Sequence, residues 1–320
     1  AVPRWRPIDV LGAPRPAGAF VRRHVALLAF DTEAFAGGAQ ALTVPLRLDG
    51  VHTVSAVEGD VAQRFADCAA RLLGVVQQVL PASHREATLF QVVVPAEGDA
   101  ALLSAVSGLL KVAAKESGRF VPQLLLAEPR VSPLQLVSDL QACESSGRQV
   151  FRRSAQGLQA EHFDEVPAGD GAALAWKPEG VYLITGGSGM LALLLAREIA
   201  ARCPGARLLL GSRSAPPGTW AAAGLCVEHR CVDVTDGSAV QGWVDDAMQR
   251  HGRIDGVIHA AGVLRDAWIG NKTADEFHRV LAPKVQGLVH LDRVAAPRQL
   301  IGARETARSG ADHQHALAAR

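Results

Sequence analysis

A glycine-rich stretch is the first part of the sequence whose residue types and spacing could do chemistry. It runs Thr185-Gly-Gly-Ser-Gly-Met-Leu-Ala192, in which Gly187, Gly189 and Ala192 fit the spacing G-x-G-x-x-G/A. Glycines let a backbone approach a pyrophosphate, and the N-terminus of a following helix offers unpaired N–H groups to its charge. A purely structural tight turn would need the same glycines. The apolar run before the loop and the amphipathic stretch after it favour a dinucleotide site.

The residues that follow two later apolar runs could select the nucleotide. The first of these runs ends in Ser212-Arg213-Ser214, where a carboxylate would bind the ribose hydroxyls of NAD. An arginine with small hydroxyls suits the extra phosphate of NADP instead, although an ordinary solvated arginine is the alternative. Asp233 and Val234 close the next run, where a carboxylate could meet the adenine amino group. We therefore expect NADPH as the cofactor.

A metal site is not expected. Cys226, His229 and Cys231 are close in sequence, but the period-two alternation of a strand places Cys226 on the opposite face from the other two, which favours packing. His313 and His315 lie in a polar tail, where we expect them to be solvated. The cysteines are odd in number, five, and scattered, which suits a reducing compartment, so we expect a cytoplasmic protein.

Composition excludes several classes of protein. With 320 residues, 48% hydrophobic and 20% charged, the chain can bury a large core and is not a disordered protein. The formal net charge of +1 provides no field for gripping nucleic acid or an anionic membrane, so neither is expected as a partner. No apolar run is long enough to span a bilayer.

The elements that must position these residues alternate between strand-like and helix-like runs. In the first half we expect strands at 24–30, 43–48, 88–94 and 120–126 and helices at 60–80 and 101–115. In the second half we expect strands at 181–185, 207–211, 226–234 and 254–259 and helices at 189–202, 237–251 and 273–280, the first of these helices with Leu191, Leu194, Leu195 and Ile199 inward. The fold class is therefore α/β, with two tandem Rossmann-like, doubly wound parallel-sheet units, the second incomplete. The expected divisions are 1–175, 176–296 and a tail at 297–320.

Three stretches carry a resemblance to a known family. They are the glycine loop, then His259-Ala-Ala-Gly-Val-Leu-Arg-Asp266, and then Asn271-Lys-Thr through Leu281-Ala-Pro-Lys-Val-Gln-Gly287. Together they make the second half similar to the ketoreductase domain of modular type I polyketide synthases, within the short-chain dehydrogenase/reductase superfamily. The first half resembles the structural subdomain of those domains, a degenerate Rossmann unit that binds no cofactor. The likeness covers about residues 20–290.

The resemblance implies an activity and a set of site residues. Such domains use NADPH to reduce the β-ketone of an acyl chain held as a phosphopantetheine thioester on an acyl carrier protein, alongside other polyketide synthase domains. Lys284 matches the catalytic lysine that lowers the pKa of the proton donor, and Ala260–Gly262 match the wall of the nucleotide site. Asp266 matches the last aspartate of a Leu-Asp-Asp triplet that marks D-type stereochemistry, although a surface or helix-capping carboxylate is the alternative. The expected cofactor contacts are Thr185, Gly186, Gly187, Ser188, Gly189, Met190, Leu191, Ser212, Arg213, Ser214, Asp233, Val234, Ala260, Ala261 and Gly262.

The family pattern stops soon after Lys284. The family would continue into a catalytic serine and tyrosine, whereas the one tyrosine of this chain, Tyr182, precedes the glycine loop, where we expect it to pack in the sheet. The tail at 297–320 does not resemble the family. We therefore expect a ketoreductase truncated at its C-terminus, part of something longer and inactive by itself. A non-catalytic structural domain of a megasynthase and a free short-chain reductase of a small substrate are the alternatives, and the degenerate first half argues against the latter.

Overall fold

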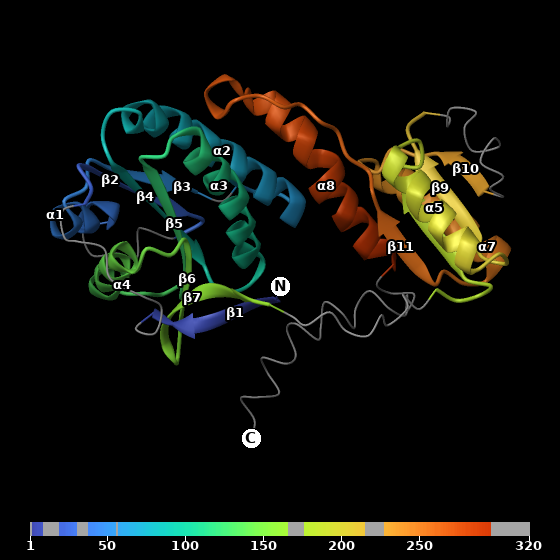
Figure 1. The fold of residues 1–320 in the computed structure, drawn as a ribbon, viewed down its shortest axis with the longest axis horizontal. Coiled ribbons are helices and arrows are strands. Elements are labelled where there is room, and N and C mark those ends of the chain that lie inside the picture. The colour runs from blue at the N-terminus through green and yellow to red at the C-terminus, as the bar shows by residue number, and fades with distance from the viewer. Residues whose placement is uncertain are drawn as a thin grey trace. The chain divides into compact units, whose positions relative to one another are not determined.

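The computed structural model describes residues 2–8, 19–30, 38–55, 57–165, 176–214 and 227–295. The chain divides into two compact units (Figure 1). Unit 1 is Ala1–Gly169 together with Arg265–His278, and unit 2 is Asp170–Leu264 together with Arg279–Arg320. The expected boundary near residue 175 falls among residues outside the described ranges and stays a prediction. The return of a short later segment to unit 1 was not expected.

Unit 1 is built on a seven-stranded sheet with the strand order β1-β7-β6-β5-β4-β2-β3. Its strands are β1 (Val2–Pro7), β2 (Arg22–Leu28), β3 (Gly50–Val54), β4 (Thr88–Pro95), β5 (Phe120–Ala127), β6 (Val150–Ser154) and β7 (Gly157–Asp164). The strands from β3 to β6 pair in parallel, whereas β7 and β1 add antiparallel partners at one edge. All eight residues of β4 are buried, as a central parallel strand covered on both faces requires.

The helices of unit 1 cover its sheet. They are α1 (Thr43–Leu46), α2 (Val61–Ser83), α3 (Ser107–Glu116) and α4 (Pro133–Ser146), with the short 3-10 helix η3 (Asp99–Val106) before α3. Asp60 begins α2 with a capping box, because its carboxylate accepts from the N–H of Gln63 and the Gln63 side chain accepts from the N–H of Asp60. On one face of the sheet, Leu42, Leu46, Leu136 and Leu140 share a buried cluster with Val25, Leu27, Val93 and Leu125.

Unit 2 contains a four-stranded parallel sheet with the order β10-β9-β8-β11 among its described residues. Its elements are β8 (Val181–Thr185), α5 (Met190–Arg202), β9 (Arg207–Ser212), β10 (Val227–Cys231), α7 (Gly237–His251) and β11 (Gly256–His259), together with the part of α8 (Ala274–Ala295) from Arg279 onward. Apolar residues of α5 pack with Tyr182, Ile184 and Leu210 on one face. Residues of α7 and the last turns of α8 pack with Val181, Leu183 and Leu209 on the other.

The segment Arg265–His278 folds as part of unit 1. Its 3-10 turn η4 (Ile269–Asn271) is held by Gln77, whose side-chain amide donates to the carbonyl oxygens of Ile269 and Lys272, each at 2.7 Å. The carboxylate of Glu116 accepts from the N–H of Ile269 at 2.9 Å, and the Ile269 side chain is buried. Three groups from this segment are thus bound by α2 and α3.

Several expected elements need correction. The run 43–48 forms the helix α1 rather than a strand, and this helix ends at Arg47, whose φ is 52°. On α5, Leu191 and Leu194 are 59% and 54% exposed, not inward, because Ala192, Leu193 and Ala196 form the buried stripe. The helix expected at 273–280 continues to Ala295, through Pro283. The antiparallel strands β1 and β7 were not expected.

The α/β fold class is confirmed, with helices around sheets dominated by parallel strands. No helix among the described residues is both long enough and apolar enough to cross a membrane. The expected tail at 297–320 and the residues Cys226, His313 and His315 lie outside the described ranges.

Candidate nucleotide-binding site

The glycine loop crosses the carboxyl end of β8 very close to two neighbouring strands. Gly186 has a φ of 69°, and a Cβ there would lie 2.5 Å from the carbonyl oxygen of Ala260. A Cβ on Gly187 would lie 2.8 Å from the Cβ of Leu210. The left-handed φ and the backbone contact together require glycine at position 186. The loop is therefore pressed against the sheet, which leaves its outer side open.

The helix α5 starts directly from this loop without a side-chain cap. The N–H of Gly189 donates to the carbonyl oxygen of Gly186 at 2.8 Å, and no side chain caps the following turn. Ser188, Gly189 and Met190 are exposed. A helix of 13 residues whose first N–H groups are uncapped is suited to bind an anion such as a pyrophosphate.

The loop also lies where open α/β sheets bind ligands. β8 pairs with β9 on one side and with β11 on the other, so the direction of strand addition reverses beside it. Ligands of such sheets bind outside the carboxyl ends of the strands at this switch point. The expected contacts on β8, β9 and β11 all belong to carboxyl ends, and the structure brings them together in unit 2.

At the end of β9, one expected contact has a hydrogen-bonded side chain and the next two residues are exposed. Ser212 is 6% exposed, and its hydroxyl donates to the carbonyl oxygen of Ser214 and lies 2.7 Å from Nε2 of His229. Burial lowers the pKa of His229 below its usual value. Arg213 and Ser214 are exposed. These two are free to meet a ligand, whereas Ser212 serves first to hold the strand end.

The end of the third strand of this unit is also held internally. The carboxylate of Asp233 accepts from the N–H of Thr235 at 2.9 Å and from its hydroxyl at 2.8 Å. Val234 is 5% exposed, and its carbonyl oxygen lies 3.0 Å from Nδ1 of His290 on α8. One Asp233 oxygen remains without a bond among those found in the described residues, so this carboxylate can still reach an amino group.

Thr185 joins β8 to the residues that follow β11. Its hydroxyl oxygen accepts from the N–H groups of Ala260 and Ala261 at 3.1 and 3.2 Å, and it lies 2.8 Å from Nδ1 of His259. Nε2 of His259 in turn lies 2.9 Å from the carbonyl oxygen of Pro283 on α8. Burial lowers the pKa of His259, partly opposed by this hydrogen bond. His259 was not among the expected site residues, although it begins the stretch His-Ala-Ala-Gly that was singled out.

Lys284 follows Pro283 directly and belongs to the same site. A Cβ on Gly262 would lie 3.7 Å from Cε of Lys284, so the lysine side chain passes beside the Ala260–Gly262 segment. Lys284 is exposed. Its ammonium group is therefore accessible next to the expected wall of the nucleotide site.

Tyr182 is a core residue, as expected. Its side chain is 3% exposed, its hydroxyl accepts from the N–H of Lys177 at 2.7 Å, and its ring meets that of Trp176 edge-on at 5.3 Å. Asp255 lies near the same end of the sheet and binds the N–H of Val181 at 3.0 Å. Both residues lie toward the amino ends of the strands, away from the glycine loop.

Asp266 falls in a different unit from the other expected site residues. It belongs to Arg265–His278 of unit 1 and is exposed, whereas Lys284 and all the expected cofactor contacts belong to unit 2. Its expected part in stereochemistry stays a prediction.

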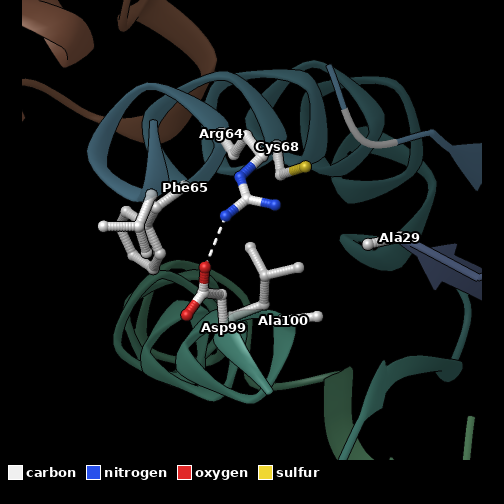
Figure 2. Close-up of a pocket in the computed structure, with 8 residues that line it drawn as sticks. Ala29, Arg64, Phe65, Cys68, Asp99 and Ala100 are labelled. Carbon is white, nitrogen blue, oxygen red and sulfur yellow. Dashed lines mark hydrogen bonds and ion pairs between the residues drawn. The ribbon is translucent and has the colours of Figure 1, made fainter. Parts of the chain in front are cut away.

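Unit 1 has a pocket of its own at the corresponding place (Figure 2). It lies after β2, and it is lined by Ala29, Val61, Arg64, Phe65, Cys68, Asp99, Ala100 and Leu103. Its cavity volume is about 40 Å³, room for a few water molecules. The guanidinium group of Arg64 pairs with the carboxylate of Asp99 at 2.5 Å beside it. No dinucleotide fits in this space.

Comparison with known proteins adds a family match and several relatives. Residues 180–301 match the KR domain family. The chain is 31% identical over 254 residues to polyketide synthase PksN of Bacillus subtilis, covering 77% of the chain and 5% of that protein. It is 32% identical over 298 residues to polyketide synthase ThaG of Burkholderia thailandensis, covering 90% of the chain and 5% of that protein. The chain thus spans about one twentieth of the length of these curated relatives.

Solved structures agree with the family match. A ketoreductase domain from the bacillaene assembly line superposes with a TM-score of 0.77 at 27% identity, covering 92% of this chain and 69% of that one. The ketoreductase from the first module of phoslactomycin biosynthesis in Streptomyces sp. HK803 gives a TM-score of 0.61 at 26% identity, covering 91% and 69%. With the glycine loop, the parallel sheet and Lys284 in place, the chain belongs to the ketoreductase domains of polyketide synthases, whose fold is that of the short-chain dehydrogenases/reductases.

Proposed function

We propose that this chain carries the cofactor half of a ketoreductase site that uses NADPH to reduce a β-ketoacyl group to the β-hydroxyacyl form. The family implies a nicotinamide cofactor, and the choice of NADPH is part of the proposal. One observation carries it. The glycine crossing at the carboxyl end of β8, where a Cβ on Gly186 would lie 2.5 Å from the Ala260 carbonyl oxygen, leaves an uncapped helix N-terminus facing outward in the same unit as Lys284.

Different residues of unit 2 are proposed to bind different parts of the cofactor. The first N–H groups of α5 bind the pyrophosphate, Arg213 and Ser214 meet the extra phosphate, and Asp233 meets the adenine. The Ala260–Gly262 segment forms the wall beside the ribose. When bound, the reduced nicotinamide supplies the hydride for the ketone. Lys284 lies beside that wall, where its positive charge would lower the pKa of a proton donor placed next to it.

The proton donor itself is not supplied by these residues. The family uses a tyrosine, and the single tyrosine of the 320 residues is Tyr182. Its side chain is 3% exposed, and its hydroxyl is bound to the N–H of Lys177. We therefore propose that the 320-residue chain alone binds NADPH weakly and does not reduce a ketone.

The proposed substrate and partners follow from the family rather than from a docking surface. The acyl chain would be presented as a phosphopantetheine thioester by an acyl carrier protein, and other polyketide synthase domains would be the neighbours. We propose the cytoplasm as the compartment. Cys68, Cys143, Cys203 and Cys231 are free thiols, which suits a reducing environment.

Fluorescence titration of the purified chain with NADPH and with NADH tests the cofactor assignment. We expect measurable NADPH binding that Arg213→Ala weakens by roughly tenfold while NADH binding stays unchanged, because Arg213 would lose a charge-assisted bond to the extra phosphate. Arg197→Ala, at an exposed arginine of α5, is the matched control and should change neither. Equal affinity for the two nucleotides would contradict the assignment to NADPH.

A steady-state assay with a soluble β-ketoacyl thioester tests the second part of the proposal. We expect no turnover, because the single tyrosine of the 320 residues, Tyr182, is buried and bound to the N–H of Lys177, so it cannot protonate the product alkoxide. Turnover at about 1 s⁻¹ or faster, an ordinary enzyme rate, would overturn it.

A non-catalytic structural domain of a megasynthase is the second candidate function. The buried, hydrogen-bonded Tyr182 favours it over a working enzyme. The glycine loop decides between the two: a complete absence of NADPH binding by a folded chain would support the structural role and contradict the proposed cofactor half.

A further inference from the structure

We infer that His259, neutral and protonated on Nε2, is the positioning residue that ties the helix carrying Lys284 to the glycine loop. The inference rests on the proposed function only for the meaning of Lys284. The connection itself consists of contacts within unit 2, from Thr185 at the end of β8 through His259 at the end of β11 to Pro283 on α8.

The tautomer follows from the partners of the ring. A carbonyl oxygen can only accept, so Nε2 of His259, 2.9 Å from the Pro283 oxygen, must carry a proton. On the other side, the Thr185 oxygen already accepts two bonds, from the N–H groups of Ala260 and Ala261. Both of its lone pairs are used, so the Thr185 hydroxyl must donate to Nδ1 of His259, which lies 2.8 Å away and is therefore unprotonated.

This arrangement excludes the charged ring. An imidazolium would bring a second N–H toward the Thr185 oxygen, which has no lone pair left to accept it. The proton count is therefore satisfied only when the ring is neutral. The partial burial of His259 acts in the same direction, since burial disfavours the charged form.

A second observation shows that α8 is built to approach His259 closely. Gly287 lies one turn after Pro283, and a Cβ there would lie 3.3 Å from Cε1 of His259 and 2.9 Å from Cγ2 of Val234. Glycine at 287 thus lets the helix come near enough for the Pro283 carbonyl to be reached. A further bond, between His290 and the Val234 carbonyl oxygen at 3.0 Å, holds the next turn.

The position of Lys284 depends on this bond because Lys284 directly follows Pro283. A displacement of the Pro283 carbonyl moves the Cα of Lys284 with it, and the Lys284 side chain passes beside Gly262. His259 acts on Lys284 through its bond to the Pro283 carbonyl oxygen. Its effect is to fix where the ammonium group of Lys284 lies relative to Ala260 and Ala261, whose N–H groups donate to the same Thr185 hydroxyl.

Two substitutions separate the two bonds of the ring. His259→Gln can keep an N–H donor near the position of Nε2 and so keep the bond to Pro283. His259→Asn is shorter; its amide oxygen can accept from Thr185, but its side chain does not reach Pro283. A merely structural demand for a polar side chain at this position would be met equally by both, so the difference between the variants reports the bond to α8.

Three measurements on the full chain without nucleotide test the inference. Nitrogen-15 NMR of the imidazole at neutral pH should show His259 protonated on Nε2 alone. Hydrogen exchange in the turn from Pro283 to Gly287 should accelerate by roughly five- to tenfold in His259→Asn, the size expected for one lost hydrogen bond, and return to within about twofold in His259→Gln. After reductive methylation with carbon-13 formaldehyde, the Lys284 signal should shift in His259→Asn and return in His259→Gln. Lys284→Arg, which removes that signal, assigns it.

The outcomes are distinct from those of the cofactor tests. A ring protonated on Nδ1, or a His259→Gln chain that behaves like His259→Asn, overturns the inference. If either variant fails to fold, the imidazole spectrum of the unchanged chain still decides the tautomer on which the argument stands. Failure of NADPH to bind would contradict the proposed function while leaving all three measurements interpretable.

Discussion

Units 1 and 2 each have a sheet of their own with neighbouring parallel strands, but they differ in what crosses the carboxyl end of the first parallel strand. In unit 1, β2 pairs with β3 and β4, and in unit 2, β8 pairs with β9 and β11, so each unit has a switch point beside its first parallel strand. Each of these strands is followed by a residue with a left-handed φ, 54° at Ala29 and 69° at Gly186. Topology and backbone turn are therefore alike at the two places.

The difference lies in the side chains that meet at this point. In unit 2 the residue after the strand has no Cβ, and a Cβ there would lie 2.5 Å from the backbone of the segment after β11. In unit 1 the residue is an alanine, and the side chains of Arg64, Phe65 and Asp99 reduce the space to about 40 Å³ (Figure 2). The two units thus have the same switch-point topology, and they differ in whether side chains occupy the place where the chain crosses the carboxyl end of the first parallel strand.

The buried polar side chains of the two units also lie at different places in their sheets. In unit 1 the side chains of Gln91 and Gln123, 3% and 2% exposed, bond to each other in the middle of the sheet. Among the described residues of unit 2, Thr185 and Ser212 are buried at carboxyl ends of strands, whereas the buried carboxylate of Asp255 lies at the amino ends. The described part of unit 2 thus has buried polar groups at the ends of its strands, whereas the two glutamines of unit 1 lie within the sheet.

The largest effect on stability is expected from adding a side chain where the glycine loop crosses the carboxyl end of β8 in unit 2. Gly186→Ala adds a Cβ 2.5 Å from a backbone oxygen and forces alanine into a left-handed φ. The strained φ costs about 1–2 kcal/mol and the overlap about 1–3 kcal/mol more, so we expect unit 2 to lose about 3 kcal/mol of its free energy of unfolding. Chemical denaturation followed by hydrogen exchange in β8 and β11 measures this loss.

The matched change in unit 1 is Ala29→Gly. It relieves a left-handed φ of 54°, but the added freedom of glycine in the unfolded chain offsets the gain, so we expect a change within about 1 kcal/mol. If Gly186→Ala proved as mild as Ala29→Gly, the contrast between the two crossings would be wrong.

The next largest effect is expected from removing the hydrogen bonds between the buried glutamines of unit 1. Gln123→Leu removes the donor to the carbonyl oxygens of Cys143 and Arg148, at 2.6 and 3.1 Å, and the partner of the Gln91 amide. Buried groups left without partners cost about 1–3 kcal/mol, so we expect a loss of about 2 kcal/mol confined to unit 1. Hydrogen exchange should rise in β4 and β5 and stay unchanged in β8, and an equal rise in both units would contradict the separate roles of the two cores.

Much of this arrangement could be predicted from sequence because it depends on local patterns. Buried parallel strands such as β4 and β5 are continuous apolar runs, and the glycine loop has its spacing and its flanking elements in one stretch of chain. The strands β1 and β7 lack such a run. Arg4 and Arg6 alternate with other residues along β1, and polar or charged residues interrupt β7. β1 pairs with β7 over a separation of more than 150 residues, and β7 pairs on its other side with β6. The run 43–48 alternates like a strand, yet Pro45 lies in the first turn of a helix that ends at a left-handed Arg47.

The parts of the site that could not be predicted depend on contacts between distant elements. His259 gains its importance from Thr185 and from the Pro283 carbonyl on α8, and neither partner is near it in the sequence. Ser212 was expected to meet the cofactor, but the position of His229 on the neighbouring strand engages its hydroxyl. Pattern and spacing identify which stretches approach the site, whereas the bonds among them depend on the register of the sheet.

A smaller effect concerns the amino ends of the strands in unit 2. The side chain of Asp255 is 4% exposed; burial by itself would raise its pKa, but bonds to Arg253, Lys177 and the Val181 N–H outweigh it and lower the pKa to about 2. The ionised form is thus favoured by folding. Its stabilisation is present above the unfolded pKa of about 4 and is lost as the pH falls toward 2.

Asp255→Asn should therefore lower the free energy of unfolding by about 2 kcal/mol at pH 7 and by about half as much at pH 3. Urea denaturation at both values, read from probes in unit 2, measures the difference. Asp246→Asn, at an exposed carboxylate that pairs with Arg230 and Arg250 on the surface, is the control and should cost less than about 1 kcal/mol at either pH. If Asp255→Asn lowered the free energy of unfolding equally at both pH values, the charge of Asp255 would not be the cause of the loss.

The smallest effect is expected where the two switch points are made more alike. Arg64→Ala in unit 1 removes an ion pair with Asp99 in which the two side chains are 40% and 62% exposed, so we expect a change of no more than about 1 kcal/mol. Unit 1 should still bind no nucleotide, because Ala29 and Phe65 continue to fill the crossing and no glycine lets the backbone approach. The measurement is an NADPH titration in a Gly186→Ala background, with and without Arg64→Ala, so that any difference between the two chains reports a change in unit 1. Binding gained there on adding Arg64→Ala would mean that one ion pair, rather than the side chains at the crossing, distinguishes the two units.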